Sequence, residues 1–301
     1  MAGLLRNLAE QTLPPWEVVV VDGALDEDRE TEQVVREAID SLLCHCIYLR
    51  QTGGTAVQRN AGIERATGDF IAFVDDDIRL EADFFQVMVD AFAKDVTHRV
   101  GGIVGYRSNQ WFPADRSPRW KWYRRLRLLT TYEPGRYDFI TGYPINANMQ
   151  PPFSGIRSVD FMTTSCAVWR REVMEEGLRF DPFFRDYGVL EDAHFSLRAG
   201  REWELWQCGD ARCVHLEASG GRVDRRSIGY KCVVNYHYVF KDIAGPLSWK
   251  SEARFWRYQA FELLRLAVSS VTRRRMGDLS EVRGRLDGVL SFIQQELRAG
   301  R

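Results

Sequence analysis

The sequence predicts an α/β fold in which a mostly parallel sheet is flanked by helices and followed by a helical C-terminal extension. Two observations predict this class. Residues 16–22 (WEVVVVD) and 70–74 (FIAFV) are predominantly apolar runs of strand length that end in or lead into acidic residues, and such runs are typical of parallel strands buried on both faces. Stretches with helical spacing alternate with these runs over the first hundred residues, which indicates helices on both faces of the sheet.

The elements follow in order along the first part of the chain. We expect strands at residues 16–22, 47–50, 70–74 and 100–106. We expect four helices: one that begins near residue 4, and three that span residues 27–43, 55–66 and 82–93. Gly53-Gly54 opens the third of these helices and Gly68 closes it. Ligands of such sheets bind at the carboxyl ends of the strands, which is where Asp22 and the triplet Asp75-Asp76-Asp77 stand.

The remainder of the chain is less regular. Residues 108–156 are rich in Trp, Tyr, Arg and Pro with poor periodicity, so we interpret them as a long excursion. Strand and helix signals return at residues 159–173, and Glu191-Asp192 opens a helix that stops at Gly200. We expect two further strands at residues 203–208 and 213–216, and mainly helix from residue 227 to the end.

Composition and charge exclude several classes of protein. Hydrophobic residues make up 45% and charged residues 28% of the 301 residues, which is typical of a soluble globular protein. The net charge of −1 provides no overall attraction to nucleic acid, so we expect no such partner. No run reaches the ~18 apolar residues of a membrane span, and the six scattered cysteines indicate reduced thiols. We therefore expect a cytoplasmic protein, or one held peripherally at the inner face of the membrane.

The triplet Asp75-Asp76-Asp77 is the strongest candidate for chemistry. Three adjacent carboxylates repel one another, and their oxygens are ligands that suit Mn²⁺ or Mg²⁺. Acidic residues are also common in solvated turns and at helix starts. Taken alone, the triplet fits both explanations equally well.

Three other features bear on this choice, and each has an ordinary structural alternative. Gly53-Gly54-Thr55 can present backbone N–H groups to an anion, with Arg59 on the following helix, although it can equally be a simple helix cap. Glu191-Asp192 can supply a general base or only a charged helix start. His215 follows an apolar strand, where a single histidine is more often structural than a ligand.

Together these features resemble family 2 glycosyltransferases of the GT-A fold. The matching stretches are TLPPWEVVVVDGALDED, GGTAVQRNAGIERATGDFIAFVDDD, FMTTSCAVWRREV, LEDAHFSLRAG and VHLEAS, which cover roughly residues 4–219. A DDD alone is a weak signal, whereas the order of strand-Asp, QRNAG, strand-DDD, ED and a late His is a specific one. The resemblance implies a Rossmann-like sheet and an inverting transfer from a nucleotide-activated sugar.

The resemblance also implies roles for individual residues. Asp192 corresponds to the catalytic general base, and Asp77 and His215 correspond to the metal-binding residues for Mn²⁺ or Mg²⁺. The residues expected to bind the nucleotide-sugar are Asp22, Arg59, Asn60, Asp75, Asp76 and Glu191. Asp22 is followed by Gly23-Ala24 where many members have a second acid or Gly-Ser, so the identity of the base stays open.

The implied partners are a nucleoside diphosphate sugar and a glycan or lipid-linked acceptor, as in cell-surface glycan or polysaccharide biosynthesis. The implied domains are a catalytic domain of residues 1–222, divided into a nucleotide-sugar-binding half (1–107) and an acceptor-binding and catalytic half (108–222), and an extension of residues 223–301. Residues 111–143 can line an acceptor groove or form a packed insertion. The alternatives are a sugar-phosphate nucleotidyltransferase, which would usually have a Gly-rich phosphate loop after its first strand, and a non-catalytic glycosyltransferase-like binding module.

Two expectations concern the ends of the chain. Apolar and basic residues together suit a helix on a membrane surface, and the C-terminal candidates are Phe255, Trp256, Phe261, Leu264 and Leu266 with Arg254, Arg257, Arg265 and Arg273–Arg275. Packing on the catalytic domain is the alternative. Family members usually open with a central strand ahead of the helix that begins here near residue 4, so we expect the natural polypeptide to start about 15–25 residues upstream. A missing central strand would leave backbone groups of its neighbours unpaired.

Overall fold

The computed structural model describes residues 1–39, 42, 44–113, 117–184, 188–216, 224–272 and 276–299. The chain divides into two compact units. Unit 1 comprises Met1–Pro113, Pro134–Arg136 and Asn146–Ser219, and unit 2 comprises Ala114–Glu133, Tyr137–Ile145 and Gly220–Arg301. The expected domain boundary after residue 222 lies outside the described residues. Most of the aromatic excursion between residues 117 and 145 groups with the C-terminal helices, not with the sheet that precedes it.

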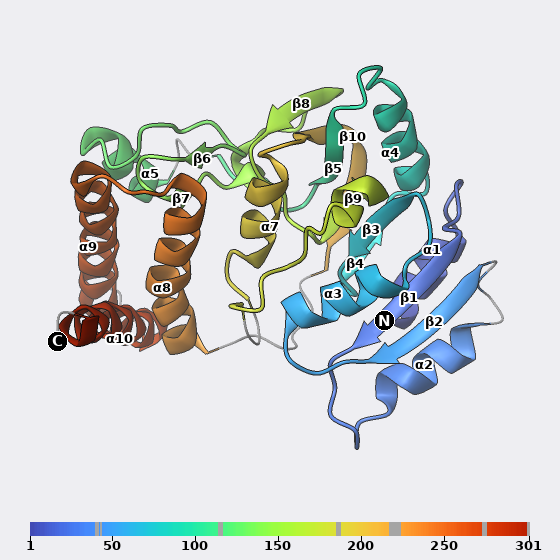
Figure 1. Ribbon diagram of the computed structural model, residues 1–301, viewed down its shortest axis with the longest axis horizontal. Coiled ribbons are helices and arrows are strands. Elements are labelled where there is room, and N and C mark those ends of the chain that lie inside the picture. Colours follow the sequence, from blue (N-terminus) through green and yellow to red (C-terminus); the bar gives the residue numbers. More distant parts are fainter. Residues whose placement is uncertain are drawn as a thin grey trace. The chain divides into compact units, whose positions relative to one another are not determined.

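Unit 1 is built on two sheets (Figure 1). β1 (Glu17–Asp22) and β2 (His45–Arg50) form a parallel pair. The larger sheet has the order β3-β9-β5-β10-β4, with β8 also paired to β10. Its strands are β3 (Phe70–Val74), β4 (Ile78–Leu80), β5 (Val100–Arg107), β8 (Ile156–Val159), β9 (Cys166–Arg170) and β10 (Glu204–His215). β3, β5 and β10 share one direction, whereas β9, β8 and β4 run opposite to it. The predicted α/β fold is therefore confirmed, and the larger sheet is mixed.

Helices complete unit 1, and several of them bury one apolar stripe. In α4 (Phe84–Ala93), for example, Phe84, Met88 and Phe92 recur every four residues and are all buried. The other helices are α1 (Ala2–Ala9), α2 (Glu30–Ala38), α3 (Thr55–Arg65), α6 (Arg171–Glu175), α7 (Glu191–Ala199) and the 3₁₀ helix η3 (Ala147–Met149). The expected helices and strands of the first hundred residues are therefore present, with ends that shift by a few residues.

Two elements differ from the expectation. The expected strands at residues 203–208 and 213–216 are one continuous strand, β10, whose register against β5 shifts between Gln207 and Arg212. Gly209-Asp210 in this shift looks like a turn in the sequence, but the backbone passes through it as an irregularity in the ladder. β4 was not expected, since three residues are too few to show an alternating pattern.

β1 and β2 stand apart from the larger sheet in their hydrogen bonding. Among the described strands, β1 pairs with β2 and β3 pairs with β9, so β1 and β3 are not hydrogen-bonded to each other. The expectation of a further strand upstream stays a prediction.

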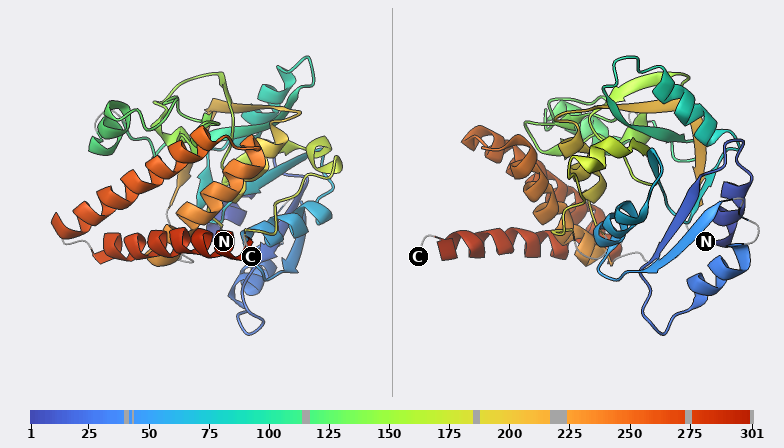
Figure 2. Two further views of the ribbon diagram at one scale, coloured as in Figure 1. Left: turned by 60° about the vertical axis from the view of Figure 1, so that its left-hand side comes forward. Right: turned by 45° about the vertical axis from the view of Figure 1, so that its right-hand side comes forward.

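Unit 2 is mainly helical. It contains α5 (Pro118–Arg125), the short hairpin β6 (Tyr137–Asp138) and β7 (Tyr143–Pro144), and the helices α8 (Arg225–Ala244), α9 (Trp249–Thr272) and α10 (Met276–Ala299), which are coloured orange to red in Figure 2. α8 and α10 approach closely because Gly284 has no side chain, and a Cβ there would collide with the carbonyl of Arg226. Trp120, Tyr123 and Tyr143 are buried, so these aromatic residues of the excursion belong to a packed insertion.

The C-terminal helices bear on the expected membrane contact. No helix in the described ranges is long and apolar enough to cross a membrane. Phe255 and Leu266 are buried in unit 2, so these two residues do not form part of a lipid-facing surface, which corrects that part of the expectation. Leu264 is 63% exposed. The basic run Arg273–Arg275 lies outside the described residues.

Candidate active site

The acidic triplet occupies the turn between β3 and β4. The backbone N–H of Asp75 donates to the carbonyl of Ser165 at 3.3 Å, and that of Ile78 donates to the carbonyl of Asp75 at 3.1 Å. β4 then pairs with the end of β10, with Ile78 opposite His215. This pairing brings two expected metal-binding residues together, since His215 Nε2 lies 3.0 Å from Asp77 Oδ1.

His215 is held from its other ring nitrogen by a chain of side-chain amides. Gln110 Nε2 lies 2.6 Å from His215 Nδ1. Asn148 Nδ2 donates to Gln110 Oε1 at 3.2 Å, and Arg107 Nη2 donates to Asn148 Oδ1 at 2.9 Å. A continuous relay of hydrogen bonds therefore runs from Arg107 through Asn148 and Gln110 to His215, and ends at Asp77.

Arg107 fixes the direction of this relay, because a guanidinium can only donate hydrogen bonds. Asn148 must turn its oxygen toward Arg107 and its nitrogen toward Gln110, and Gln110 then presents its own nitrogen to His215. His215 Nδ1 is thus an acceptor, so the ring carries its proton on Nε2 and donates it to Asp77. In this arrangement His215 orients Asp77, and its Nε2 offers no lone pair to a metal unless both amides of the relay reverse.

Arg59 joins the triplet to the second acidic pair. It lies on α3, which begins after Gly53 and Gly54, both at positive φ angles that favour glycine. Its guanidinium is 3.1 Å from Glu191 Oε1 and 3.7 Å from Asp75 Oδ1. The Thr55 hydroxyl also donates to Glu191, at 3.4 Å. A single cation therefore links two acidic motifs that are far apart in the sequence.

The carboxyl groups at this site have unusual proton affinities. Burial raises the pKa of Asp192 to about 6, with a further contribution from the charge of Glu191 and opposition from Arg59. Partial burial likewise raises the pKa of Asp75, against the effect of Arg59 and with that of Asp77. Asp192 is the second residue of α7, and its carboxylate accepts the backbone N–H of Ala193 at 2.7 Å. A carboxyl group with a pKa near 6 is suited to general-base catalysis at neutral pH.

The surroundings of three other predicted site residues, Asp76, Asp22 and Asn60, differ from those of Asp75 and Asp77. Asp76 is the most exposed of the triplet, at 64%. Asp22 accepts hydrogen bonds from the Tyr48 hydroxyl at 2.6 Å and from the backbone N–H of Ala24 at 2.9 Å. Asn60 uses both atoms of its amide on the backbone of Phe180, each at 2.8 Å. In this structure Asn60 therefore fastens α3 to the Phe180 segment, and its predicted contact with the nucleotide stays a prediction.

Sequence reasoning missed the relay residues Arg107, Gln110 and Asn148. Arg107 directly follows the strand expected at residues 100–106, so its place at the carboxyl end of a strand was a usable signal. Gln110 and Asn148 lie in the irregular excursion, where no periodicity marks them. Their role depends on partners that are distant in the sequence.

The residues at the turn fit a divalent cation whose coordination is completed by a substrate. No three His, Cys, Asp or Glu side chains of the described ranges gather closely enough to hold a metal alone. Hard divalent cations in transferases are commonly held by one or two carboxylates together with substrate phosphates. Asp77, held by His215 and only 19% exposed, provides such a carboxylate.

The sequence and the fold are similar to those of known proteins. The sequence model of the family described as glycosyl transferase family 2 matches residues 1–178. The Bacillus subtilis strain 168 protein named "Uncharacterized glycosyltransferase YwdF" is 29% identical over 238 residues, which are 76% of this chain and 73% of that protein. Among solved structures, the mannosyltransferase PcManGT from Pyrobaculum calidifontis, in complex with GDP-Man and Mn²⁺, has a TM-score of 0.52 at 16% identity, covering 95% of this chain and 81% of that one.

Two shorter matches have more specific names. The B. subtilis strain 168 protein named "Putative teichuronic acid biosynthesis glycosyltransferase TuaG" is 33% identical over 79 residues, which are 26% of this chain and 31% of that protein. The glucosyl-dolichyl phosphate glucuronosyltransferase of Haloferax volcanii is 31% identical over 101 residues, which are 33% of this chain and 32% of that protein. The match to each therefore spans about a third of the relative's length.

Proposed function

Because the chain belongs to glycosyl transferase family 2, we propose that it moves a sugar from a nucleoside diphosphate sugar to an acceptor hydroxyl, with inversion at the anomeric carbon and with Mn²⁺ or Mg²⁺ as cofactor. One observation carries this proposal. Arg59 contacts both Asp75 and Glu191, so the acidic triplet and the pair that contains Asp192 belong to one site. Such a site contains both a carboxylate for a metal and a separate carboxylate for a base.

The donor half of the site is assigned to the triplet and its surroundings. Asp77 would hold the metal, and His215 would join it only if the Arg107 relay reverses. When bound, the metal would neutralise charge on the diphosphate and stabilise it as a leaving group. The donor would be bound by the predicted residues Asp22, Arg59, Asn60, Asp75, Asp76 and Glu191.

The catalytic step is assigned to Asp192. Its ionised carboxylate takes the proton of the acceptor hydroxyl while the hydroxyl oxygen forms a bond to the anomeric carbon. The bond from that carbon to the diphosphate oxygen breaks, and the diphosphate leaves with the bonding electrons on the face opposite the acceptor. With a pKa of about 6, Asp192 is mostly ionised at neutral pH and is still basic enough to accept the proton.

The comparisons guide the choice of substrates. PcManGT is named with GDP-Man and Mn²⁺, which supports a nucleotide-sugar and a divalent metal here. TuaG is named for a biosynthetic pathway of teichuronic acid, and the H. volcanii enzyme for a sugar on dolichyl phosphate. We therefore assign the acceptor to a glycan or a lipid-linked sugar in cell-surface polysaccharide biosynthesis.

A thermal-stabilisation screen of nucleotide-sugars with Mn²⁺ tests this function, because a ligand that binds only the folded state raises its stability. The expected result is stabilisation by one nucleoside diphosphate sugar that is lost with EDTA and in Asp77→Ala. Asp90→Ala is the matched control, since Asp90 is an exposed acid on α4. Turnover should release a free nucleoside diphosphate. Unchanged donor binding in Asp77→Ala would contradict the metal assignment, and release of pyrophosphate would indicate a nucleotidyltransferase.

A peripheral position at the inner face of the cell membrane is part of the proposal. Leu264, Val268 and Val271 form one row along α9 and are all more than half exposed, which suits an interfacial helix. Arg265 does not belong to that surface, because it pairs with the buried Glu262. Flotation with anionic vesicles tests the idea: Val268→Glu should reduce the bound fraction, whereas Val96→Glu, at a 92% exposed position of unit 1, should not. Equal flotation of the two variants would remove the proposal.

A further inference from the structure

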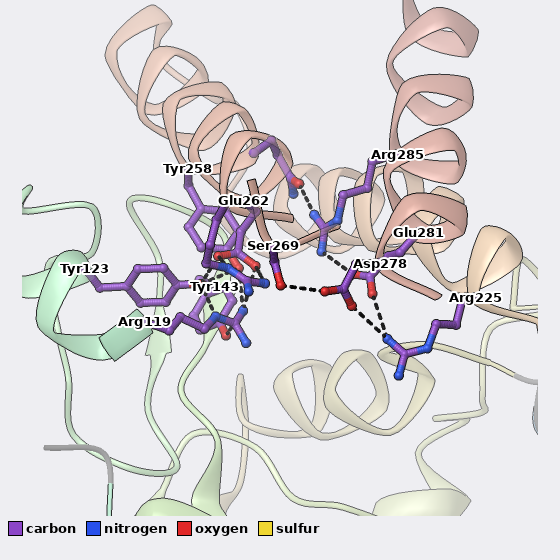
Figure 3. Close-up of polar contacts among 12 residues, drawn as sticks. Arg119, Tyr123, Tyr143, Arg225, Tyr258, Glu262, Ser269, Asp278, Glu281 and Arg285 are labelled. Carbon is purple, nitrogen blue, oxygen red and sulfur yellow. Dashed lines mark hydrogen bonds and ion pairs between the residues drawn. The ribbon is translucent and has the colours of Figure 1, made fainter. Parts of the chain in front are cut away.

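Unit 2 contains a cavity of about 380 Å³ with walls that are charged and aromatic (Figure 3). Side chains from α5, α8, α9 and α10 line it together with Tyr143 of β7. Its volume falls within the ~300–1,000 Å³ in which proteins usually hold small molecules. No part of the glycosyltransfer proposal uses this cavity, and all of its lining residues belong to unit 2.

The wall that contains Arg225, Asp278, Glu281 and Arg285 has as many carboxylates as guanidinium groups, and we call it the balanced wall. Arg225 lies 3.5 Å from Asp278 and 3.7 Å from Glu281, and Arg285 lies 3.4 Å from Glu281. Figure 3 shows the two carboxylates between the two arginines. Asp278 also accepts the Ser269 hydroxyl at 2.6 Å. Each cation of this wall already has a carboxylate partner, so the wall has no net charge and presents acceptor oxygens.

The wall around Glu262, which we call the charged wall, has one guanidinium in excess. Arg119 of α5 and Arg265 of α9 share the single carboxylate of Glu262, which is 1% exposed. Arg265 donates to both of its oxygens at 2.9 Å, Arg119 lies 3.1 Å from Oε2, and the Tyr123 hydroxyl donates to Oε1 at 2.7 Å. Burial would raise the pKa of Glu262, but these donors and charges lower it to about 2. Glu262 therefore stays ionised, and two cations with one anion leave a single positive charge.

Both guanidinium groups of the charged wall keep hydrogen-bond donors for a ligand. Within the described part of the chain, the polar contacts of Arg119 and of Arg265 use Nε and Nη2, which leaves Nη1 of each. The two side chains are 36% and 31% exposed, so a ligand in the cavity can reach them. Arg119 also donates to the Tyr143 hydroxyl at 3.5 Å, which leaves the hydrogen of that hydroxyl for another acceptor. Guanidinium and hydroxyl donors together suit a carboxylate or a phosphate.

We propose that this cavity binds an acidic sugar whose single phosphate or carboxylate lies against Arg119 and Arg265. A bare anion would fill only a small part of the 380 Å³, so the ligand carries a larger body. The rings of Tyr143, Tyr236 and Tyr258 line the space, with the Tyr143 centroid 4.8 Å from that of Tyr258 and 6.1 Å from that of Tyr236. Aromatic faces suit a sugar ring, and the sugar hydroxyls can donate to the carboxylates of the balanced wall.

Calorimetric titration of the full chain in EDTA tests the proposal, with glucose 1-phosphate, glucuronate, inorganic phosphate and glucose as probes. At least one acidic sugar should bind about tenfold or more tightly than either inorganic phosphate or glucose, because only an acidic sugar contacts both walls. The tighter of the two acidic sugars identifies the acidic group. Asp77→Ala should bind this probe like the parent protein, which separates the cavity from the proposed donor site.

Two arginines of α5 provide a matched pair of variants. The guanidinium groups of Arg119 and Arg124 each lie over a tyrosine ring, at 5.2 and 5.0 Å from the ring centroid, but only Arg119 lines the cavity. Arg119→Met makes the charged wall neutral, because Arg265 remains as the partner of Glu262, and should weaken binding of the acidic sugar about tenfold. Arg124→Met should weaken it less than twofold. Arg265→Met removes the same excess charge from another helix and should cause a loss similar to that of Arg119→Met.

Arg225→Met tests where the acidic group lies. Arg225 belongs to the balanced wall, so its loss should weaken binding of the acidic sugar less than the loss of Arg119. An effect of Arg225→Met that equals or exceeds that of Arg119→Met would overturn the proposal. Absence of binding by both acidic sugars, equally tight binding of inorganic phosphate, or loss of binding in Asp77→Ala would also overturn it.

Discussion

The two units of this chain each contain a cluster of arginines and carboxylates, and the two clusters are unbalanced in opposite directions. In unit 1, Arg59 is shared by Asp75 and Glu191, with Asp192 beside them. In unit 2, Glu262 receives Arg119 and Arg265 together with a tyrosine hydroxyl. Carboxylates are in excess in the first cluster and guanidinium groups in the second.

The difference appears in the proton affinities. The pKa of Asp192 is raised to about 6 by burial and by the charge of Glu191, whereas the donors around Glu262 lower its pKa to about 2 in spite of burial. Similar residue types therefore produce a titratable base in one unit and a fixed charge in the other. A cluster with excess carboxylates is suited to a metal cation and to proton transfer, and a cluster with excess guanidinium groups to an anion.

The largest effect should come from the titratable cluster. Asp192→Asn should reduce kcat about 10²–10⁴-fold, because it removes the base that takes the acceptor proton. The affinity for the donor should change little, since the base acts on the acceptor. Steady-state kinetics and donor titration measure the two effects, with Asp160→Asn, a half-buried acid paired with Arg136 in unit 1, as the control. A variant with near-parent kcat would exclude Asp192 as the base.

Removal of the fixed charge of Glu262 should lower the free energy of unfolding. Glu262→Gln keeps the shape of the side chain but leaves Arg119 and Arg265 without their buried counter-charge, so the free energy of unfolding should fall by about 3–5 kcal/mol. Glu252→Gln is the control, because Glu252 pairs with His237 at a 35% exposed position and such pairs contribute only ~1 kcal/mol or less. Denaturant unfolding measures both. Equal losses of unfolding free energy in the two variants would mean that Glu262 is coupled to its arginines no more strongly than Glu252 is to His237.

The sequence was informative where one short segment determines the structure. The limits of β3 follow from an apolar run between Asp69 and Asp75, and the start of α3 follows from Gly53-Gly54. Asp77, His215, Asp75 and Glu191 were expected near one site, and the structure brings them into contacts through His215 and Arg59. These assignments depend on local periodicity and on the resemblance, both of which can be read from sequence.

The parts that were missed depend on distant partners. The amides of Asn148 and Gln110 acquire a role only because Arg107 and His215 stand at the two ends of their relay. The excursion appeared to be either a groove or an insertion, because nothing local shows that Tyr123 packs against Tyr258, with 5.7 Å between ring centroids. The charged cavity of unit 2 likewise combines arginines from three separate helices and the excursion.

The relay offers a way to ask whether His215 binds the metal. In the observed direction, ligation by His215 would break the bond from Arg107 to Asn148, so Arg107→Met should remove that obstacle. Mn²⁺ should then bind about tenfold more tightly, which corresponds to one hydrogen bond from a charged donor. Arg107→Lys, which keeps both charge and donors, should resemble the parent.

Removal of a nearby positive charge could raise the affinity for a cation by itself, so the control is a double-mutant cycle with His215→Ala. If His215 becomes a ligand when the relay is released, Arg107→Met should have little effect in the His215→Ala background. An undiminished gain in that background would show that the effect is purely one of charge, with His215 only orienting Asp77. Calorimetric titration of Mn²⁺ measures all four proteins.

The smallest predicted effect is a pH dependence that separates the two clusters. Asp192 is active when ionised, so its raised pKa of about 6 means that kcat/KM should fall to half near pH 6 and about tenfold by pH 5. Glu262 has the opposite sign: its pKa is lowered from 4.5 to about 2, so its contribution to stability is complete above pH 4.5 and declines only in more acidic solution. Between pH 7 and pH 5 the activity should therefore decline while this contribution to the unfolding free energy stays constant.

Rate profiles and denaturant unfolding in the same buffers test this pH dependence, and Asp192→Asn should lack the acidic limb in its residual activity. An acidic limb that persists in that variant, or a loss of stability that parallels the loss of rate, would show that a group other than Asp192 is titrating.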